Sequence, residues 1–387
     1  MLHTFAVSHY RSLRELKLCL APLTVVTGAN GSGKSNLYRA LRLLQRAAEG
    51  TLAQALAMEG GIESVCWAGP ANPSDRARRG FKAEGGPRSS PLRVSFGFAS
   101  DDFACEISLG RRAGGNPEVG GSFFSADPEV KSEFLWQQPP RRKASTWLAR
   151  EGDGVSLREQ DGSWTRLDYS PSRSRSLLSE LGEPARFPEI LAMRERLRRW
   201  RFYDGFRTDV DSSLRQSRVS VQTDVLASDG SDLAAALQTI IEIGDEEALD
   251  AAIDDALPGT RFKVQSDARG LQVGLHVEGL LRAMTAMELS DGTLRYLALL
   301  AALLTPRPPE LLVLNEPEQS LHPDLLSPLA RQIVAASKRT QVWIISHAPR
   351  LVEAIEDLSA TTAVELVREA GETRIRGQRP IDAPVWP

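Results

Sequence analysis

The sequence predicts an α/β protein with an antiparallel β subdomain and a mainly helical insertion. Residues 13–50 read as two strands, a glycine-rich loop and a helix. Residues 60–169 combine glycines and prolines with short alternating runs, which favours antiparallel hairpins. Residues 261–387 alternate helix and strand again. We therefore expect an N-terminal lobe over 1–170, a mainly helical insertion over 171–260 and a C-terminal lobe over 261–387.

Composition excludes several classes of protein. The 387 residues are 42% hydrophobic and 25% charged, with a net charge of -3, as in ordinary soluble globular proteins. Charge so near zero argues against a wholly basic nucleic-acid binder. Cys19, Cys66 and Cys105 are odd in number, widely spaced and without nearby histidines, which argues against a disulfide framework and a zinc site. The N-terminus has no apolar signal core, and the apolar run Leu297–Leu304 is shorter than the ~18 residues of a membrane span. We expect a cytoplasmic protein without membrane segments.

Local patterns place the first elements. Residues 13–20 alternate and residues 23–28 are apolar, which predicts two strands before a periodic helix over 36–49 that ends at a glycine. The runs LRVSFGF and DFACEISLG predict antiparallel strands. Glycine-rich stretches at 85–91 and 114–121 are typical of surface loops.

Helical patterns begin near Ser176. The run FPEILAMRERLRRWRFYDGF has a proline near its start and helix-spaced apolar residues, which are Ile190, Leu191, Leu197, Trp200 and Tyr203. Further helices are expected over 231–244 and 245–259, followed by short strands around Phe262 and Val273. The insertion should therefore be mostly α-helical.

Residues 28–35 read GANGSGKS and fit the pattern G-x-x-x-x-G-K-[ST] between an apolar strand and a helix. Gly31 and Gly33 would let consecutive backbone N–H groups face an anion. Lys34 would reach terminal phosphates, and Ser35 would offer a hydroxyl to Mg²⁺. The alternative is a glycine-rich turn beside an ordinary lysine. The sequence context favours the phosphate cradle.

A second pattern is PELLVLNEPEQSLHP. The apolar run Leu311–Leu314 predicts a buried strand whose carboxyl end carries Asn315 and Glu316. In a parallel sheet this end lies beside a phosphate loop. Glu316 could then accept a proton from an attacking water. Alternatively, it merely caps the next helix.

A third strand, in QVWIISHAPRLVEAI, ends at Ser346 and His347 just before another helix. A lone histidine is usually structural. At the tip of an apolar strand in a nucleotide-binding protein, however, it is placed to donate to a γ-phosphate or to hold a water molecule. We favour this functional interpretation of His347.

The segment ELSDGTLRYLALLAALL places Ser290 and Gly292 at the start of an apolar helix. Such a start can bind an anion. The local sequence alone favours a simpler interpretation, in which Ser290 and Asp291 cap the helix and Gly292 serves the turn.

In their order along the chain, these motifs resemble those of ABC-type ATPases. The details look like the RecF-like and SMC-like branch, and specifically like stand-alone prokaryotic ATPases related to the OLD family. GANGSGKS resembles Walker A, ELSDGTLR the ABC signature, LLVLNEP Walker B, EQSLHPD the D-loop, and IISHAP the switch-histidine motif. The opening VSHYRSL resembles the first strand of RecF relatives, which would place Arg11 near the nucleotide. The resemblance covers essentially the whole chain.

This resemblance implies ATP and Mg²⁺ as cofactors and assigns roles to residues at matching positions. The implied catalytic residues are Glu316, His347 and Lys34, and the implied metal ligands are Ser35 and Asn315. The implied nucleotide contacts are Gly28, Asn30, Gly31, Ser32, Gly33, Lys34, Ser35, Asn36, Arg11, Ser290 and Gly292.

Three departures from the family pattern stand out. Walker B usually ends in Asp-Glu, whereas Asn315 here brings no charge to Mg²⁺. If the asparagine merely weakens Mg²⁺ binding, Asn315→Asp should lower the Mg²⁺ requirement; if the site depends on the neutral amide, the same change should abolish activity, because two adjacent carboxylates would raise the pKa of the base. The Q-loop glutamine has only Gln137 and Gln138 as candidates. The 40 residues after His347 are too few for the Toprim nuclease of OLD proteins, and no long heptad run suggests an SMC-like arm.

The resemblance implies that two copies pack head to tail, each signature helix completing the ATP site of the other. We expect an ATPase that acts as an ATP-gated dimeric switch in DNA repair or maintenance, or in mobile-element defence. A non-hydrolysing sensor that regulates an effector partner, such as a nuclease or toxin, stays open because of Asn315. A transporter ATPase is disfavoured by the LHP form of the D-loop.

Direct DNA contact would fall in the insertion. Residues 141–218 contain 17 basic and 12 acidic residues, a net charge of +5. The candidate phosphate contacts are Arg194, Arg196, Arg198, Arg199 and Arg201. An equally simple interpretation is a solvated helix face whose arginine stems cover apolar surface.

Overall fold

The computed structural model describes residues 1–69, 93–112, 124, 127–137, 141–142, 144–159, 161–184, 186–379 and 382–384. The loops expected at 85–91 and 114–121 lie outside these residues. Two compact units make up the chain: unit 1 comprises Met1–Ala21, Ala29–Arg198 and Glu365–Pro387, and unit 2 comprises Pro22–Gly28 and Arg199–Val364. The boundaries of these two units differ from those of the three expected segments.

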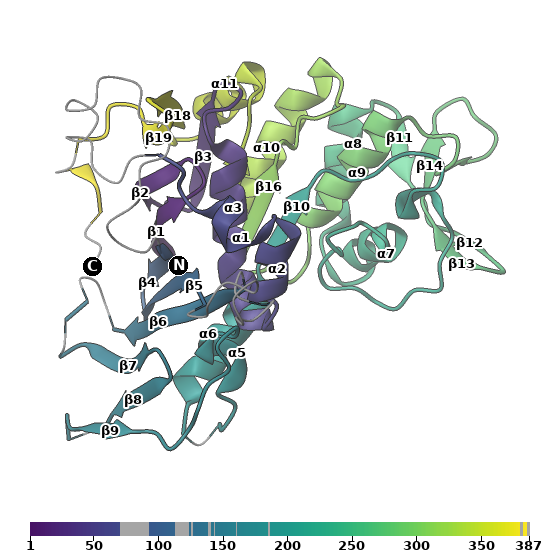
Figure 1. Cartoon of the computed structure of the whole chain (residues 1–387). Coiled ribbons are helices and arrows are strands. Elements are labelled where there is room, and N and C mark those ends of the chain that lie inside the picture. Colours follow the sequence, from purple (N-terminus) through teal and green to yellow (C-terminus); the bar gives the residue numbers. More distant parts are fainter. Residues whose placement is uncertain are drawn as a thin grey trace. The chain divides into compact units, whose positions relative to one another are not determined.

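Unit 2 contains a row of parallel strands (Figure 1). They lie in the order β10 (Arg201–Asp204), β16 (Leu311–Asn315), β17 (Gln341–Ile345) and β3 (Leu23–Gly28). Leu314 is opposite Ile344, which is opposite Val25, and all three are buried. Strands β16 and β17 are almost continuously apolar because a parallel sheet is covered on both faces.

Helices surround these strands and share their apolar core. They are α7 (Leu233–Ile243), α8 (Glu246–Ala256), α9 (Asp291–Leu303), α10 (Leu326–Ala336) and α11 (Pro349–Leu358). Short strands follow α8: β11 (Thr260–Phe262), β12 (Gln265–Asp267), β13 (Gly270–Gln272), β14 (Gly274–Val277) and β15 (Met284–Thr285). Single 3₁₀ turns lie at Ser213–Arg215 and Pro323–Leu325. The helices expected over 231–244 and 245–259 are confirmed.

The helix expected across FPEILAMRERLRRWRFYDGF is wrong in its second half. Helix α6 (Pro188–Arg199) ends before Trp200, and the next residues form strand β10. Phe202 and Tyr203 are buried opposite Val313 and Leu314 of β16. Aromatic residues favour strands, and pairing with a buried parallel strand outweighs the helical spacing.

Unit 1 is dominated by an antiparallel sheet (Figure 1). Its strands lie in the order β2 (Leu13–Cys19), β1 (Leu2–Tyr10), β4 (Arg93–Ser100), β5 (Ala104–Arg111), β6 (Pro128–Trp136), β7 (Thr146–Glu151), β8 (Gly154–Arg158) and β9 (Trp164–Arg166). Helix α1 (Lys34–Glu49) packs against β1 and β4, where Phe5, Val7 and Phe96 are buried. The antiparallel region expected within 60–169 is confirmed for the described residues.

The remaining elements of unit 1 are short. They are α2 (Leu52–Met58), α3 (Gly61–Val65), α5 (Leu177–Glu180) and the antiparallel pair β18 (Val364–Glu369) and β19 (Glu372–Ile375). Helix α1 ends at Gly50 in a left-handed conformation, as its sequence predicts. Within the described ranges, no helix has both the length and the apolar character of a membrane span.

Candidate functional site

Neighbouring strands of unit 2 end at the residues that the sequence motifs single out. Glu316 directly follows β16, Ser346 and His347 follow β17, and Gly28 ends β3, where the glycine-rich loop begins. The backbone N–H of Glu316 donates to the carbonyl oxygen of Ile345 at 2.8 Å. Parallel strands place their carboxyl ends at one edge of the sheet. That edge carries Glu316, His347 and the start of the loop.

The loop between β3 and α1 requires glycine at Gly33. Its φ is +110°, a conformation that residues with a side chain rarely adopt. A Cβ atom at Gly33 would lie 2.1 Å from Oγ1 of Thr373 and 3.0 Å from Oγ of Ser12. Gly31 also has a positive φ, of +78°. The loop therefore turns tightly against neighbouring side chains.

Thr373 and Ser12 support this loop. Ser12 lies in the VSHYRSL segment, whereas no sequence motif includes Thr373. The Thr373 hydroxyl donates to the carbonyl oxygen of Ser32 at 2.7 Å, and its oxygen lies 2.7 Å from Oγ of Ser12. Nδ2 of Asn36 donates to the same Ser12 oxygen at 2.8 Å. Thr373 lies 341 residues from Ser32 along the chain. No local pattern can reveal a contact at that separation.

The donors of this loop fit a phosphate group. Oγ of Ser32 is buried and has no hydrogen-bond partner among the described residues. Helix α1 begins after Gly33 without a side-chain cap or an acidic residue in its first turn. Lys34 is largely buried, and its Nζ donates to the carbonyl oxygen of Ala29 at 3.2 Å. Such a set of donors at a helix start suits an anion, and the Ser35 hydroxyl lies in the same turn.

Glu316 has a strained backbone. Its φ is +50°, which is uncommon for a residue other than glycine. The side chain is one-third exposed, and its Oε1 lies 3.8 Å from Nδ1 of His347. Because strained residues persist where the surrounding structure fixes them and often mark functional sites, this conformation agrees with a special role for Glu316.

Glu318 connects the D-loop to the switch-histidine motif, and the sequence analysis missed it. The side chain is 5% exposed. Oε1 accepts hydrogen bonds from the Ser346 hydroxyl at 2.8 Å, from the His347 N–H at 2.8 Å and from the Ala348 N–H at 3.2 Å. A second acidic residue just beyond Walker B was the only sequence signal for this contact.

Asn315 also has an acidic neighbour. Residues Asp204 and Asn315 are opposite each other at the carboxyl ends of β10 and β16. Nδ2 of Asn315 donates to Oδ1 of Asp204 at 2.6 Å. The Walker B position is neutral in the sequence, but a carboxylate lies in direct contact with it.

Ser290 caps helix α9, as the simpler interpretation predicts. Its Oγ accepts a hydrogen bond from the Thr293 N–H at 3.1 Å. A Cβ atom at Gly292 would lie 3.0 Å from the carbonyl oxygen of Ser320 in the D-loop. The glycine thus allows the start of the signature helix and the D-loop to approach closely.

Two largely buried arginines hold this region in place. Arg215 donates to the carbonyl oxygen of Leu289 at 2.9 Å and to Asp291 at 2.6 Å. Arg295 donates to the carbonyl oxygen of Gln319 at 2.6 Å. Burial lowers the pKa of the Arg295 guanidinium from its ordinary value. The signature segment is therefore fixed by charged hydrogen bonds on both sides of Ser290.

Other candidates make contacts within unit 1. The Arg11 guanidinium donates to Oε2 of Glu59 at 2.8 Å, and Arg11 has a φ of +50°. Its expected proximity to a nucleotide stays a prediction. Gln137 donates its backbone N–H to the carbonyl oxygen of Ser145, whereas Gln138 lies outside the described residues.

Four of the five arginines proposed for DNA contact, all except Arg199, have side chains engaged within the described part of the protein. Arg194 donates to the carbonyl oxygens of Ser179 and Leu181, and Arg196 pairs with Asp102 at 2.6 Å. Arg198 donates to Ala48, and Arg201 donates to Arg199 and Trp200. These contacts favour the alternative interpretation, a helix face whose arginines serve the fold.

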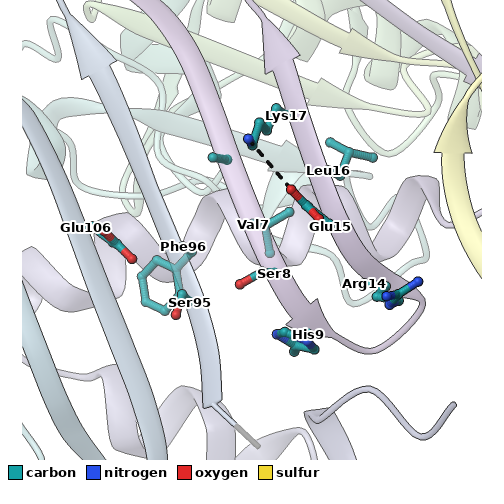
Figure 2. A pocket seen from close by; sticks show the side chains of 11 residues that line it. Val7, Ser8, His9, Arg14, Glu15, Leu16, Lys17, Ser95, Phe96 and Glu106 are labelled. Atoms are coloured by element: carbon teal, nitrogen blue, oxygen red, sulfur yellow. Dashed lines mark ion pairs between the residues drawn. The ribbon is translucent and has the colours of Figure 1, made fainter. Parts of the chain in front are cut away.

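A pocket of about 360 Å³ lies on the polar face of the antiparallel sheet, apart from these motifs (Figure 2). Small side chains such as Ser8 and Ser95, paired across β1 and β4, leave this face hollow. Glu15 and Lys17 point toward each other there, with 3.6 Å between their charged groups. Burial raises the pKa of Glu106, another residue of its lining. The lining contains no residue of the glycine-rich loop, the signature, Walker B or the switch-histidine segment.

Comparison with known families agrees with this arrangement. A family model described as "AAA domain, putative AbiEii toxin, Type IV TA system" matches residues 23–353. The chain belongs to this AAA domain family. The match begins at the first residue of β3 and extends beyond His347, so it includes the glycine-rich loop, the signature, Walker B and the switch-histidine segment. A search of curated proteins finds no match.

Solved structures show the fold of this AAA domain protein. The chain is similar to an Smc head bound to the C-winged helix domain of ScpA, with a TM-score of 0.52, 14% identity and 99% of each chain covered. It is also similar to an Smc head with an extended coiled coil, bound to the C-terminal domain of ScpA derived from Pyrococcus furiosus. That match has a TM-score of 0.50 and 13% identity, and covers 97% of this chain and 95% of the other. The predicted ABC-type P-loop ATPase fold is confirmed.

Proposed function

We propose that this AAA domain protein binds ATP with Mg²⁺ and hydrolyses it. The observation that carries this proposal is the glycine-rich loop itself. It presents a buried Ser32 hydroxyl that has no partner in the described part of the chain, and a helix start without a side-chain cap. The loop begins at the sheet edge that also carries Glu316 and His347. A phosphate would satisfy these donors, and an adjacent carboxylate is the group that activates a water molecule.

Each residue has a distinct part in this proposal. Lys34 supplies the charge that opposes the terminal phosphates, and the loop N–H groups hold the phosphate chain. Ser35 and Asn315 provide neutral oxygens suited to Mg²⁺, which would neutralise developing charge on the phosphates. Glu316 accepts a proton from the attacking water. His347 donates a hydrogen bond to the γ-phosphate.

The proposed active form is a head-to-tail homodimer. Ser290 and Gly292 stand at the exposed start of α9, where a small hydroxyl and a glycine suit close approach to the nucleotide of a second copy. Hydrolysis would remove the γ-phosphate contacts and release the two copies. ATP would thus gate the assembly.

We place this switch beside the stand-alone ATPases related to the OLD family, in mobile-element defence or DNA maintenance, acting through an effector protein. The family description, which names a toxin of a type IV system, supports the defence role. Direct DNA binding by the insertion has less support because Arg194, Arg196, Arg198 and Arg201 already have partners within the protein.

Phosphate release tests the proposal. The wild type should hydrolyse ATP with Mg²⁺, with and without duplex DNA. Glu316→Gln should lower turnover by about 100- to 10,000-fold, as expected for loss of a general base. Nucleotide binding should persist, and the variant should accumulate as an ATP-bound dimer. His347→Ala should slow turnover while the general base remains.

A second function, a non-hydrolysing nucleotide sensor, is favoured by one observation, the amide at Asn315 in place of a carboxylate. This function predicts ATP binding without phosphate release in any of Mg²⁺, Mn²⁺ or DNA. Wild type and Glu316→Gln would then behave identically. That result would replace the enzyme with the sensor.

A further inference from the structure

The side chain of Asn315 has only one orientation that its neighbour permits. The Asp204 carboxylate, which is exposed, accepts hydrogen bonds when ionised and cannot donate them. The amide end of Asn315, Nδ2, must therefore face Asp204, and it does so at 2.6 Å. The carbonyl oxygen, Oδ1, consequently points away from Asp204.

Oδ1 of Asn315 is left without a protein partner. The atom is buried and accepts no hydrogen bond from any described residue. A buried carbonyl oxygen without a donor is costly, and such atoms are rare in folded proteins. This oxygen lies at the same sheet edge as Glu316 and the start of the glycine-rich loop. A ligand at that edge would supply the missing partner.

The position of Asp204 is itself fixed by the fold. Asp204 ends strand β10, in register with Asn315. Two residues later, the carbonyl oxygen of Phe206 accepts a hydrogen bond from the buried Arg295 at 2.6 Å. Gly205, between them, has a φ of +68°, and a Cβ atom there would lie 3.3 Å from Oε1 of Gln319. The D-loop and the signature helix thus hold the end of β10.

We propose that Asp204 is the positioning residue of the metal site and that Asp204 and Asn315 together replace the single Walker B aspartate. Asp204 holds the amide so that Oδ1 of Asn315 faces the Mg²⁺–nucleotide. The Asp204 carboxylate also supplies, at this sheet edge, the negative charge that an asparagine at position 315 lacks. The inference rests on the proposed function, because it concerns the metal that accompanies ATP.

This pairing argues against one of the two outcomes considered from the sequence, in which Asn315→Asp lowers the Mg²⁺ requirement. A carboxylate at position 315 would face the Asp204 carboxylate at hydrogen-bonding distance, and two like charges there repel. The single variant should therefore lose stability and gain no metal affinity. The double variant D204N/N315D exchanges the two residues, so that an amide again faces a carboxylate and can donate a hydrogen bond to it. The negative charge of that carboxylate then lies on β16.

The experiment measures Mn²⁺ affinity by electron paramagnetic resonance with a non-hydrolysable ATP analogue bound. Asp204→Asn should weaken Mn²⁺ binding by about 10-fold or more, the loss expected for a hydrogen bond to a charged group. Asn315→Asp should also bind Mn²⁺ more weakly than the wild type. D204N/N315D should return to within about 3-fold of it. Asp211→Asn, which removes an exposed carboxylate from the same unit, should have no effect.

Thermal unfolding without nucleotide or metal gives an independent measurement. Asn315→Asp should lower the Tm, and D204N/N315D should recover it. Wild-type Mn²⁺ affinity in Asp204→Asn, or an Asn315→Asp variant that binds Mn²⁺ more tightly than the wild type, would overturn the inference. Failure of the wild type to bind the analogue in calorimetry would instead overturn the proposed function, and with it the metal role of Asp204.

Discussion

Oε1 of Glu318 lies 3.3 Å from Nδ1 of His347 and accepts a hydrogen bond from the backbone N–H of the same histidine. One buried carboxylate therefore contacts both the ring and the main chain of His347. The ring is left about half exposed, at the sheet edge where Glu316 also lies. This arrangement makes the histidine depend on a residue of the neighbouring D-loop segment.

Glu318→Ala should destabilise the protein strongly. Removing the carboxylate leaves the Ser346 hydroxyl and the His347 N–H without their acceptor, and leaves the Ala348 N–H with only Oγ of Ser346. We expect a loss of about 3 kcal/mol or more in the free energy of unfolding. Urea unfolding measures this difference. Glu318→Gln, which keeps an acceptor oxygen, should cost less, and Glu353→Ala on the exposed face of α11 should cost almost nothing. Equal stability of Glu318→Ala and wild type would contradict the network.

Thr373→Val should weaken nucleotide binding although Thr373 touches no nucleotide in our proposal. The valine keeps the shape but removes the donor to the Ser32 carbonyl, which costs about 1 to 3 kcal/mol when the partner stays buried. The loop then loses its support from β19. We expect about 10-fold weaker ATP binding in calorimetry. Thr362→Val, at an exposed position, is the control, and an equal affinity for both variants would refute the support role.

Lys34→Ala should abolish detectable ATP binding in calorimetry and leave the circular dichroism spectrum unchanged. The backbone donors of the loop alone lack the charge that opposes the terminal phosphates. Lys338→Ala removes an exposed lysine and should bind ATP normally. Unchanged affinity in Lys34→Ala would remove the phosphate-loop assignment.

Ser290→Arg should leave ATP binding by the monomer near normal but block ATP-dependent dimerisation, measured by light scattering. The arginine side chain is bulky and positively charged, and it would occupy the space in the proposed dimer where the second copy presents the small Ser290 hydroxyl. Ser290→Ala is the matched control because it loses the same helix cap, worth about 1 kcal/mol, without adding bulk. If Ser290→Arg dimerises with ATP as well as the wild type, the head-to-tail model is wrong.

The sequence predicts those parts of the protein that depend on interactions between residues close together along the chain. The strand before Gly28, the helix after Lys34 and the cap at Ser290 each depend on neighbours within a few residues. Continuous apolar runs predict the buried strands that deliver Glu316 and His347. These elements could therefore be placed without a structure.

The supporting residues could not be predicted in this way. Asp204 pairs with Asn315 only because β10 joins the parallel strands, and the helical spacing of Trp200 and Tyr203 conceals that strand. Thr373 meets the phosphate loop through a hairpin far along the chain. Their roles come from register and long-range packing, which composition and periodicity do not encode.

The contact between Thr373 and Ser32 also imposes an order of events during synthesis. A ribosome adds roughly 5 to 20 residues per second, so about 20 to 70 s separate the emergence of the two partners, which lie 341 positions apart. Throughout that interval the Ser32 carbonyl oxygen in the nascent phosphate loop lacks its hydrogen bond from the Thr373 hydroxyl. The loop gains this support only after Thr373 has been synthesised, so a shorter nascent chain is expected to bind ATP more weakly than a chain that contains Thr373.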